Sequence, residues 1–295
     1  MRVLVTGAAG QLGQALILAR PAEAVLHSAT HASLDIADAA AVDGLFRDFA
    51  PELVINAAAF TKVDDAERAP EAAARANSTG PAMLAAACRR GGAWLTHVST
   101  DYVFDGTGSR PYGTDAPANP LNVYGRTKLA GETAVLRELP QRSTVVRASW
   151  LYSAGGGFAG KMLSLMPGRT QLSIVSDQIA APTCAAGFAR VLWTLSVRRA
   201  GGLWHWCDSG VASWYDFAVA IAAEAVDLGL LPRAPAIAPI AGADYPTLAA
   251  RPPYSLLDKR ATEQLLGITA PHWRSALRDT LAQAPRAGRL RGCAP

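Results

Sequence analysis

Short apolar runs alternate with longer helical patterns along the first half of the chain. The apolar runs are rich in β-branched residues, as buried parallel strands are, and they cover residues 1–6, 25–27, 52–56, 93–99 and 144–147. Helical patterns lie between them, most clearly over residues 39–49 and 69–90. This alternation predicts an α/β fold built on a doubly wound parallel sheet.

The rhythm changes after residue 150, where glycine and proline interrupt it at residues 155–157 and 167–168. We therefore predict a larger domain over residues 1–150 and a smaller C-terminal α/β lobe, mainly for substrate, over residues 151–295. A segment near residues 183–205 is expected to return to the sheet of the larger domain. Residues 234–239 are expected to be an extended linker within the smaller lobe.

The first strand leads directly into a glycine-rich loop. Gly7, Gly10 and Gly13 form a G-x-x-G-x-x-G pattern, and a helical stretch begins at Gln14. Glycines let the backbone turn sharply beside a pyrophosphate, and the free amides of the next helix attract its charge. Because strand, loop and helix follow in the order that the motif requires, we predict a Rossmann domain that binds a dinucleotide. The glycine spacing favours the short-chain dehydrogenase branch.

Tyr124 and Lys128 are candidates for proton transfer. They stand four residues apart, so on a helix their side chains share one face. A free tyrosine has a pKa near ~10, and a neighbouring ammonium is expected to lower the pKa of the phenol. The pair then predicts a tyrosine that exchanges protons with a substrate.

A hydroxyl at the end of the fourth predicted strand completes the chemistry. Ser99 and Thr100 both stand there, and strand register decides which of them faces the helix that carries Tyr124. We choose Thr100, whose hydroxyl is expected to hydrogen-bond a substrate carbonyl beside the phenol. The alternative is that this residue only caps the loop.

Composition narrows the class of protein further. The chain has 295 residues, enough for a full core, and its formal net charge is +4. Part of that charge is Arg286, Arg289 and Arg291, which we interpret as a frayed terminus, so no nucleic-acid partner is expected. No apolar run is long enough to span a bilayer, and no signal peptide is expected before the first strand.

The cysteines indicate a reducing compartment. None of them shows C-x-x-C spacing, and no histidine cluster accompanies them: Cys88, Cys184, Cys207 and Cys293. This scatter argues against a zinc site and against a disulfide framework. We therefore expect a cytoplasmic protein with no membrane partner.

Several longer motifs resemble one enzyme family. They stand at residues 54–59 (VINAAA), 61–67 (TKVDDAE), 99–106 (STDYVFDG), 120–132 (PLNVYGRTKLAGE), 177–178, 182–183, 213–217 (SWYDF) and 251–258 (RPPYSLLD). Together they are similar to the dTDP-4-dehydrorhamnose reductases, extended short-chain dehydrogenases that make the last step of dTDP-L-rhamnose synthesis. The resemblance covers nearly the whole chain.

The resemblance implies a role for each group of residues. Tyr124 would protonate the C4 oxygen of the keto-sugar, Lys128 would hold the nicotinamide ribose, and Thr100 would fix the carbonyl. The residues that would bind the cofactor, besides Tyr124 and Lys128, are Gly7, Gly10, Gln11, Leu12, Gly13, Asp35, Ile36, Ala57, Ala58 and Ala59. The residues that would bind the dTDP-keto-deoxysugar are Val63, Thr100, Tyr102, Trp150 and Arg251. For Arg251, a surface salt bridge is the alternative.

Cofactor choice depends on the end of the second predicted strand. No carboxylate stands at residues 27–30 to bind a ribose 2′-hydroxyl, and no arginine stands there to attract a 2′-phosphate. Asp35 comes later and is expected beside the adenine. NADPH is the first choice, and we expect NADH to be accepted as well.

One departure from the family concerns a metal. Some members bridge a dimer through a magnesium ion held by glutamates, and the matching positions here are Ala15 and Ala186. A methyl group cannot ligate a hard cation. We therefore predict no metal, and a monomer or a homodimer that is not bridged by metal.

Two other classes of function stay open. A sugar-nucleotide epimerase or 4-dehydratase has the same fold. A dehydratase needs an acid pair beside the strand-four hydroxyl. Here Thr100 is followed by Asp101 and Tyr102, so the pair is missing and this alternative is weakened. A non-catalytic regulatory subunit that binds a dinucleotide is the third possibility. Such a protein has no need of Tyr124 and Lys128, and both are present.

Overall fold

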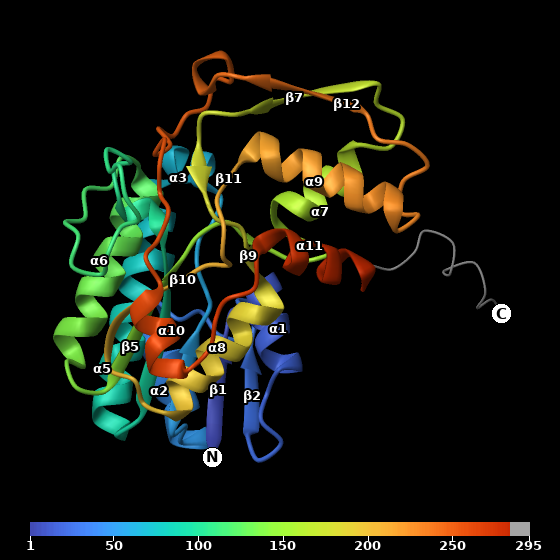
Figure 1. The fold of residues 1–295 in the computed structure, drawn as a ribbon. Coiled ribbons are helices and arrows are strands. Elements are labelled where there is room, and N and C mark those ends of the chain that lie inside the picture. Colours follow the sequence, from blue (N-terminus) through green and yellow to red (C-terminus); the bar gives the residue numbers. More distant parts are fainter. Residues whose placement is uncertain (284–295) are drawn as a thin grey trace.

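A six-stranded parallel sheet forms the centre of the larger part of the molecule in the computed structural model, which describes residues 1–283 (Figure 1). Its strands run in the order β10-β5-β4-β3-β1-β2. Their bounds are β1 Arg2–Thr6, β2 Val25–Ala29, β3 Leu53–Asn56, β4 Trp94–Thr100, β5 Ser143–Ala148 and β10 Gly202–Trp206. The order reverses between β1 and β3, so the predicted doubly wound α/β fold is confirmed.

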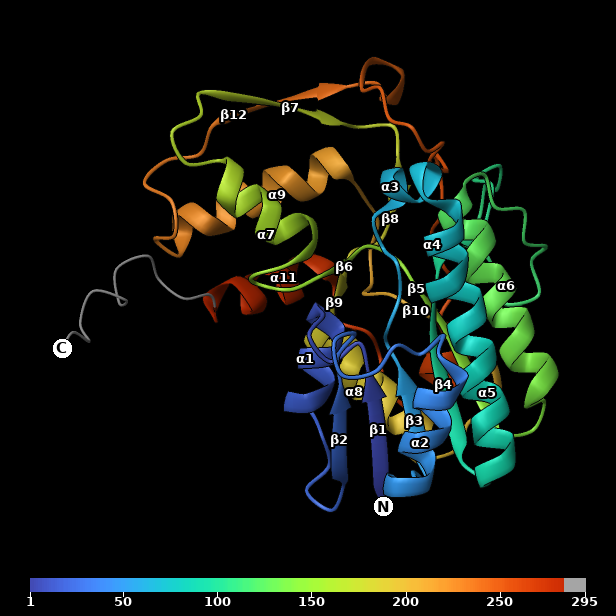
Figure 2. The same cartoon turned by 180° about the vertical axis from the view of Figure 1, so that it is seen from behind.

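Helices cover both faces of this sheet (Figures 1 and 2). Alternate residues of β1 point to opposite sides: Val3 and Val5 pack with α1 (Gln11–Leu18) and α8 (Ala185–Val197), and Leu4 packs on the other face. That second face is covered by α2 (Ala39–Phe49), α5 (Gly80–Gly91) and α6 (Val123–Glu138). Burial on both faces explains why the strands are continuously apolar.

The helix expected over residues 69–90 consists of three pieces. These are α4 (Pro70–Ala74), a π-helical turn (Arg75–Thr79) and α5. Inside the turn, Asn77 accepts a hydrogen bond from Phe60 N at 2.8 Å and donates one to Thr127 Oγ1 at 3.1 Å. Asn77 therefore fastens the loop after β3 to α6, and the wider turn gives its side chain room to do so.

The smaller part of the molecule packs three helices together with a two-stranded sheet (Figure 1). The helices are α7 (Gly157–Leu165), α9 (Trp214–Asp227) and α11 (Trp273–Ala282). The sheet is formed by β7 (Gln171–Val175) and β12 (Ala236–Ile240) in parallel. The expectation of a linker at residues 234–239 was therefore wrong for most of that stretch, because backbone pairing with β7 is a tertiary contact that local sequence does not reveal.

The remaining elements are short. They are α3 (Val63–Arg68), α10 (Arg260–Leu266), the 3₁₀ turns Asp101–Val103 and Gly242–Asp244, β6 (Leu151–Tyr152), β8 (Ile179–Ala180), β9 (Thr183–Cys184) and β11 (Ala212–Ser213). After β9 the chain returns to the larger part, where α8 packs on the six-stranded sheet and β10 forms one edge of it. The division into domains at residue 150 stays a prediction.

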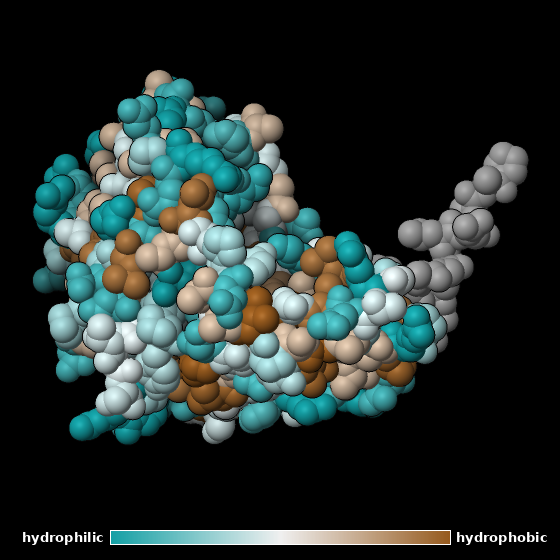
Figure 3. All heavy atoms as spheres, turned by 90° about the horizontal axis from the view of Figure 1, so that it is seen from above, coloured by the Kyte–Doolittle hydropathy of each residue, from teal (hydrophilic) through white to brown (hydrophobic). Residues whose placement is uncertain are grey.

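The surface seen from above carries hydrophobic residues in small separate patches among hydrophilic ones (Figure 3). Scattered apolar side chains of this kind are normal for a protein surface. Within residues 1–283, no helix combines the length and the apolar character needed to cross a membrane. Arg286, Arg289 and Arg291, predicted to fray, and Cys293 lie outside the described residues.

Candidate active site

A cavity of ≈ 1000 Å³ opens at the carboxyl ends of the central strands. Ligands of doubly wound sheets bind at this edge, where the strand order reverses. The predicted residues that line it are Gly7, Gly10, Gln11, Leu12, Gly13, Asp35, Ile36, Ala57, Ala58, Ala59, Val63, Thr100, Tyr102, Tyr124, Lys128 and Trp150. The structure thus gathers residues spread over 150 positions of sequence around one space, and Arg251 is not in that lining.

The glycine loop has the shape of a dinucleotide cradle. Gly7 has a φ of +69°, and a Cβ there would lie 2.6 Å from the backbone of Ala57 and Ala58. At Gly13 a Cβ would lie 2.2 Å from the Gly7 carbonyl oxygen. Only glycine allows this close packing of the loop against β3 and the start of α1. The exposed amides at that helix terminus suit the pyrophosphate of a nicotinamide dinucleotide.

Tyr124 is positioned by the way in which α6 begins. Asn122 caps the helix, since its Oδ1 accepts a hydrogen bond from Gly125 N at 2.8 Å. A Cβ on Gly125 would lie 2.2 Å from the Tyr102 carbonyl oxygen, so glycine lets the first turn approach the end of β4. The Tyr124 phenol then lies within hydrogen-bonding reach of the Thr100 hydroxyl.

Thr100 caps the loop, and its predicted contact with a substrate carbonyl stays a prediction. Its Oγ1 accepts a hydrogen bond from Tyr102 N at 3.2 Å, which caps the following 3₁₀ turn. The same hydroxyl donates to Asp101 Oδ1 at 3.1 Å and faces the cavity beside Tyr124. Capping therefore fixes the hydroxyl at the cavity surface beside Tyr124.

The electrostatics of Tyr124 differ from the expectation. Burial raises the pKa of Tyr124 to about 12, and the hydrogen bond with Thr100 opposes this shift only in part. Lys128 is buried too and donates from Nζ to the Val98 carbonyl oxygen at 2.6 Å, while burial lowers its pKa to about 8. Loss of water is the largest cause of both shifts, so the expected lowering of the phenol pKa was wrong. The phenol consequently stays protonated at neutral pH and can serve as a proton donor.

Asp101 links Thr100, at the end of β4, to Ser255 near the C-terminal end of the fold. The carboxyl is buried and accepts a hydrogen bond from Ser255 Oγ at 2.5 Å on its second oxygen. Burial raises the pKa of Asp101 to about 7, and its hydrogen bonds with Ser255 and Thr100 oppose that rise. Sequence analysis gave Asp101 no role, because its contact with residue 255 exists only in the folded chain.

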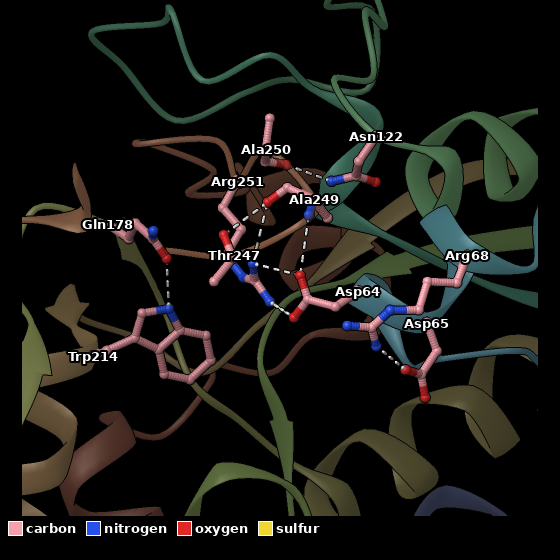
Figure 4. Close-up of polar contacts among 10 residues, drawn as sticks. All are labelled: Asp64, Asp65, Arg68, Asn122, Gln178, Trp214, Thr247, Ala249, Ala250 and Arg251. Carbon is pink, nitrogen blue, oxygen red and sulfur yellow. Dashed lines mark hydrogen bonds and ion pairs between the residues drawn. The ribbon is translucent and has the colours of Figure 1, made fainter. Parts of the chain in front are cut away.

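An aromatic pair forms one wall of the cavity. The rings of Trp150 and Trp214 are stacked, with centroids 3.5 Å apart and planes 8° apart. Trp150 has a φ of 42°, a backbone conformation rare for a bulky residue. Trp214 Nε1 donates to Gln178 Oε1 at 3.1 Å (Figure 4). Sequence analysis missed Trp214 as a site residue, although it stands in the 213–217 motif.

Arg251 lies beside the cavity wall and is held by an ion pair. Its guanidinium forms two hydrogen bonds with Asp64, of 2.7 and 3.2 Å, and Asp64 Oδ1 also accepts one from Ala249 N (Figure 4). Arg251 is also within hydrogen-bonding reach of the Tyr102 phenol. This bidentate pair joins α3 to the segment after β12. A contact of Arg251 with the substrate diphosphate stays a prediction.

Arg75 is a second residue that sequence analysis missed. It starts the π-helical turn, lines the cavity, and pairs with Asp35 at 2.7 Å between Nη2 and Oδ2. Residues 27–30 contain no arginine, as the sequence analysis noted, but the fold brings an arginine from another segment to the cavity. The fold brings Arg75 there from 40 residues beyond Asp35.

Comparison with known protein families identifies the chain. The family described as RmlD substrate binding domain matches residues 1–285. This chain belongs to that family. The match spans both parts of the fold, so the RmlD family accounts for the Rossmann sheet and for the smaller helical part together.

Curated relatives share this full-length similarity. A dTDP-4-dehydrorhamnose reductase from Streptomyces griseus is 41% identical over 298 residues, which cover 98% of this chain and 96% of the relative. A dTDP-4-keto-6-deoxy-D-glucose reductase from Streptomyces niveus is 39% identical over 279 residues, covering 94% and 95% respectively. These two members are similar in sequence to this chain, and their names give different sugars.

A solved structure extends the similarity to three dimensions. The dTDP-4-dehydrorhamnose reductase from Bacillus anthracis, in complex with NADP, has a TM-score of 0.90 at 33% identity. The match covers 96% of this chain and 99% of that one. The fold of this RmlD-family chain is therefore that of a protein known to hold NADP.

The two positions at which some family members hold magnesium are alanines on neighbouring helices. Ala15 lies on α1 and Ala186 on α8, and these helices pack against each other. Neither methyl group offers an oxygen ligand. The absence of a bridging metal and the form of any dimer stay predictions.

Proposed function

We propose that this protein reduces the C4 keto group of dTDP-4-dehydro-L-rhamnose to give dTDP-L-rhamnose, with NADPH as its preferred cofactor and NADH also accepted. The observation that carries this proposal is the Thr100, Tyr124 and Lys128 group at the cavity surface. Its support is the full-length similarity to a dTDP-4-dehydrorhamnose reductase.

The residues divide the reaction between them. Bound NADPH supplies the hydride that C4 receives. Tyr124 gives its phenolic proton to the C4 oxygen, so the carbonyl becomes a hydroxyl and the tyrosine is left as a phenolate. Lys128 is charged at neutral pH, because its pKa is about 8, and stabilises that phenolate. Thr100 lies within hydrogen-bonding reach of the phenol and is placed to contact the C4 oxygen beside it.

The pocket wall fits the proposed sugar. Trp150 and Trp214 present a flat apolar surface, and Val63 lines the same cavity. A 6-deoxy sugar carries a methyl group and an apolar ring face that suit such a surface. The exposed edge of the wall is held in place by the hydrogen bond from Trp214 to Gln178.

A direct test is product formation. Purified protein is mixed with NADPH and dTDP-4-dehydro-L-rhamnose, and the sugar nucleotide is identified after the cofactor has been oxidised. Stoichiometric dTDP-L-rhamnose supports the proposal. If NADPH binds but is not oxidised, the result contradicts the proposal and favours a non-catalytic subunit.

A second candidate is reduction of a differently configured 4-keto-6-deoxy sugar. The similarity to the Streptomyces niveus reductase favours it. Both candidates use the same proton donor, so the two keto-sugars must be compared at equal concentration. A higher kcat/KM for dTDP-4-keto-6-deoxy-D-glucose would replace the first candidate by the second. Conversion without net NADPH oxidation would indicate an epimerase.

A further inference from the structure

Arg75 lines the cavity together with His31, which follows β2 closely, and with Asp35. In Rossmann domains this ribose lies at the carboxyl end of the second strand, where an acid binds the 2′-hydroxyl of NAD or an arginine accepts the 2′-phosphate of NADP. Here β2 ends at Ala29, whose carbonyl accepts a hydrogen bond from Ala8 N in the glycine loop at 3.0 Å. Arg75, His31 and Asp35 line the same cavity just beyond it.

The guanidinium keeps donors free for a ligand. Among residues 1–283, Asp35 is the only hydrogen-bond partner of the Arg75 side chain, and it takes one N–H of the five that arginine offers. The side chain is 56% exposed, so a phosphate can reach the other N–H groups from solvent. The ion pair with Asp35 holds the flexible arginine at the cavity edge and thereby lowers the entropy lost on binding.

The nearby carboxylates keep their negative charge, but their oxygens are already hydrogen-bonded within the protein. Asp35 Oδ1 accepts a hydrogen bond from Ala37 N at 2.9 Å, and its Oδ2 pairs with Arg75. Asp38 Oδ1 accepts from Ala40 N at 2.9 Å and caps α2. Both acids are thus occupied within their own helix start or by the arginine.

We propose that Arg75 binds the 2′-phosphate of NADPH and makes the cofactor site selective for NADPH over NADH. This inference rests on the dinucleotide site of the proposed function and names the residue responsible for its cofactor preference. Arginine suits the role because its planar fork forms two parallel charge-assisted hydrogen bonds with phosphate oxygens. The competing arrangement has Asp35 beside the adenine, as the family resemblance implies, while Arg75 remains only its partner and does not contact the ribose.

Binding measurements without sugar separate these possibilities. The affinities of NADP⁺ and NAD⁺ are measured by calorimetry for the wild type, Arg75→Met and Arg90→Met. Arg90 is a matched control, because its side chain is 54% exposed and it pairs with Asp43 far from the cavity lining. Arg75→Met is expected to weaken NADP⁺ binding about 10- to 100-fold, the effect of losing charge-assisted hydrogen bonds, and to spare NAD⁺.

Each other result overturns the inference. Equal weakening of both cofactors by Arg75→Met would show a general role in the site, and unchanged NADP⁺ affinity would show no role. A wild type that binds NAD⁺ as tightly as NADP⁺ would remove the selectivity to be explained. The proposed sugar reduction is judged separately, because a protein that selects NADP⁺ and fails to reduce the sugar contradicts only that proposal.

Discussion

At the residue scale, the chemistry depends on burial as much as on identity. Tyr124 and Lys128 stand together on α6 as their spacing predicts, yet burial moves their pKa values apart, to about 12 for the phenol and about 8 for the ammonium. The tyrosine remains a protonated donor and the lysine remains a cation at neutral pH. This combination suits reduction, in which the tyrosine gives up a proton and a phenolate must be stabilised.

The pKa of Lys128 predicts an alkaline limit to turnover. Burial lowers that pKa to about 8, so turnover should fall as pH rises through about 8, when the ammonium loses its charge. Tyr124 does not titrate in this range, because its pKa is raised to about 12. The measurement is kcat against pH from 6 to 10 with saturating NADPH, with NADPH affinity recorded at each pH. A flat profile across this range would show that the charge of Lys128 is not used.

Sequence reasoning found the site residues that lie within continuous motifs. Gly7, Tyr124 and Lys128 belong to stretches whose spacing alone restricts their chemistry. The sequence analysis missed Trp214 and Arg75, because their place in the cavity lining depends on where distant elements meet. The choice of Thr100 over Ser99 depends on the register of β4, which the sequence does not give, and the structure places Thr100 within hydrogen-bonding reach of the phenol.

At the element scale, the start of α6 decides where the phenol lies. Asn122 caps the helix through Gly125 N at 2.8 Å and also donates from Nδ2 to the Ala250 carbonyl oxygen at 2.8 Å (Figure 4). One side chain therefore orients the first turn of α6 and joins it to the segment after β12. The sequence indicates this helix, but the contact with residue 250 requires the complete fold.

Removing that cap should affect stability and turnover together. Asn122→Ala is expected to lower the free energy of unfolding by about 1–2 kcal/mol, since a buried cap is lost, and to reduce kcat by displacing Tyr124. Asn119→Ala is the control, because Asn119 lies near the same helix but bonds the exposed Asp105 carboxylate. Thermal unfolding and NADPH oxidation are measured on both. Normal kcat in Asn122→Ala would show that the cap does not position the phenol.

The strands and most helices were predictable because their apolar periods match a sheet covered on both faces. Two elements were not. The π-helical turn depends on contacts of Asn77 with Phe60 and Thr127, and β12 depends on pairing with β7. Both elements depend on tertiary contacts, which a local sequence pattern does not reveal.

At the scale of the whole molecule, the cavity is formed where the two parts of the chain meet. The glycine loop, the end of β4 and the start of α6 line it from the larger part, and Trp150, Trp214 and Gly157 line it from the segments beyond. The ion pair of Arg251 with Asp64 fastens the two parts beside this space. Closing a site between two parts brings a sugar nucleotide against the cofactor and shields it from water.

Removing metal ions tests the prediction that no magnesium ion is held at Ala15 on α1 and Ala186 on α8. Because Ala15 and Ala186 cannot ligate a cation, EDTA should leave turnover and oligomeric state unchanged. The measurements are NADPH oxidation and light scattering before and after chelation, with magnesium added back. Loss of activity that magnesium restores would show a metal site that these two positions do not account for.

The central claim is that Tyr124 donates the proton in a reduction driven by NADPH, and one variant tests it most directly. Tyr124→Phe keeps the ring and removes the phenolic hydroxyl, so NADPH affinity should stay close to that of the wild type while kcat falls by about 10²–10⁴-fold. Both quantities are measured on the same preparation, by calorimetry and by NADPH absorbance with the keto-sugar nucleotide. Turnover near the wild-type value, or cofactor affinity lost together with turnover, would contradict the account.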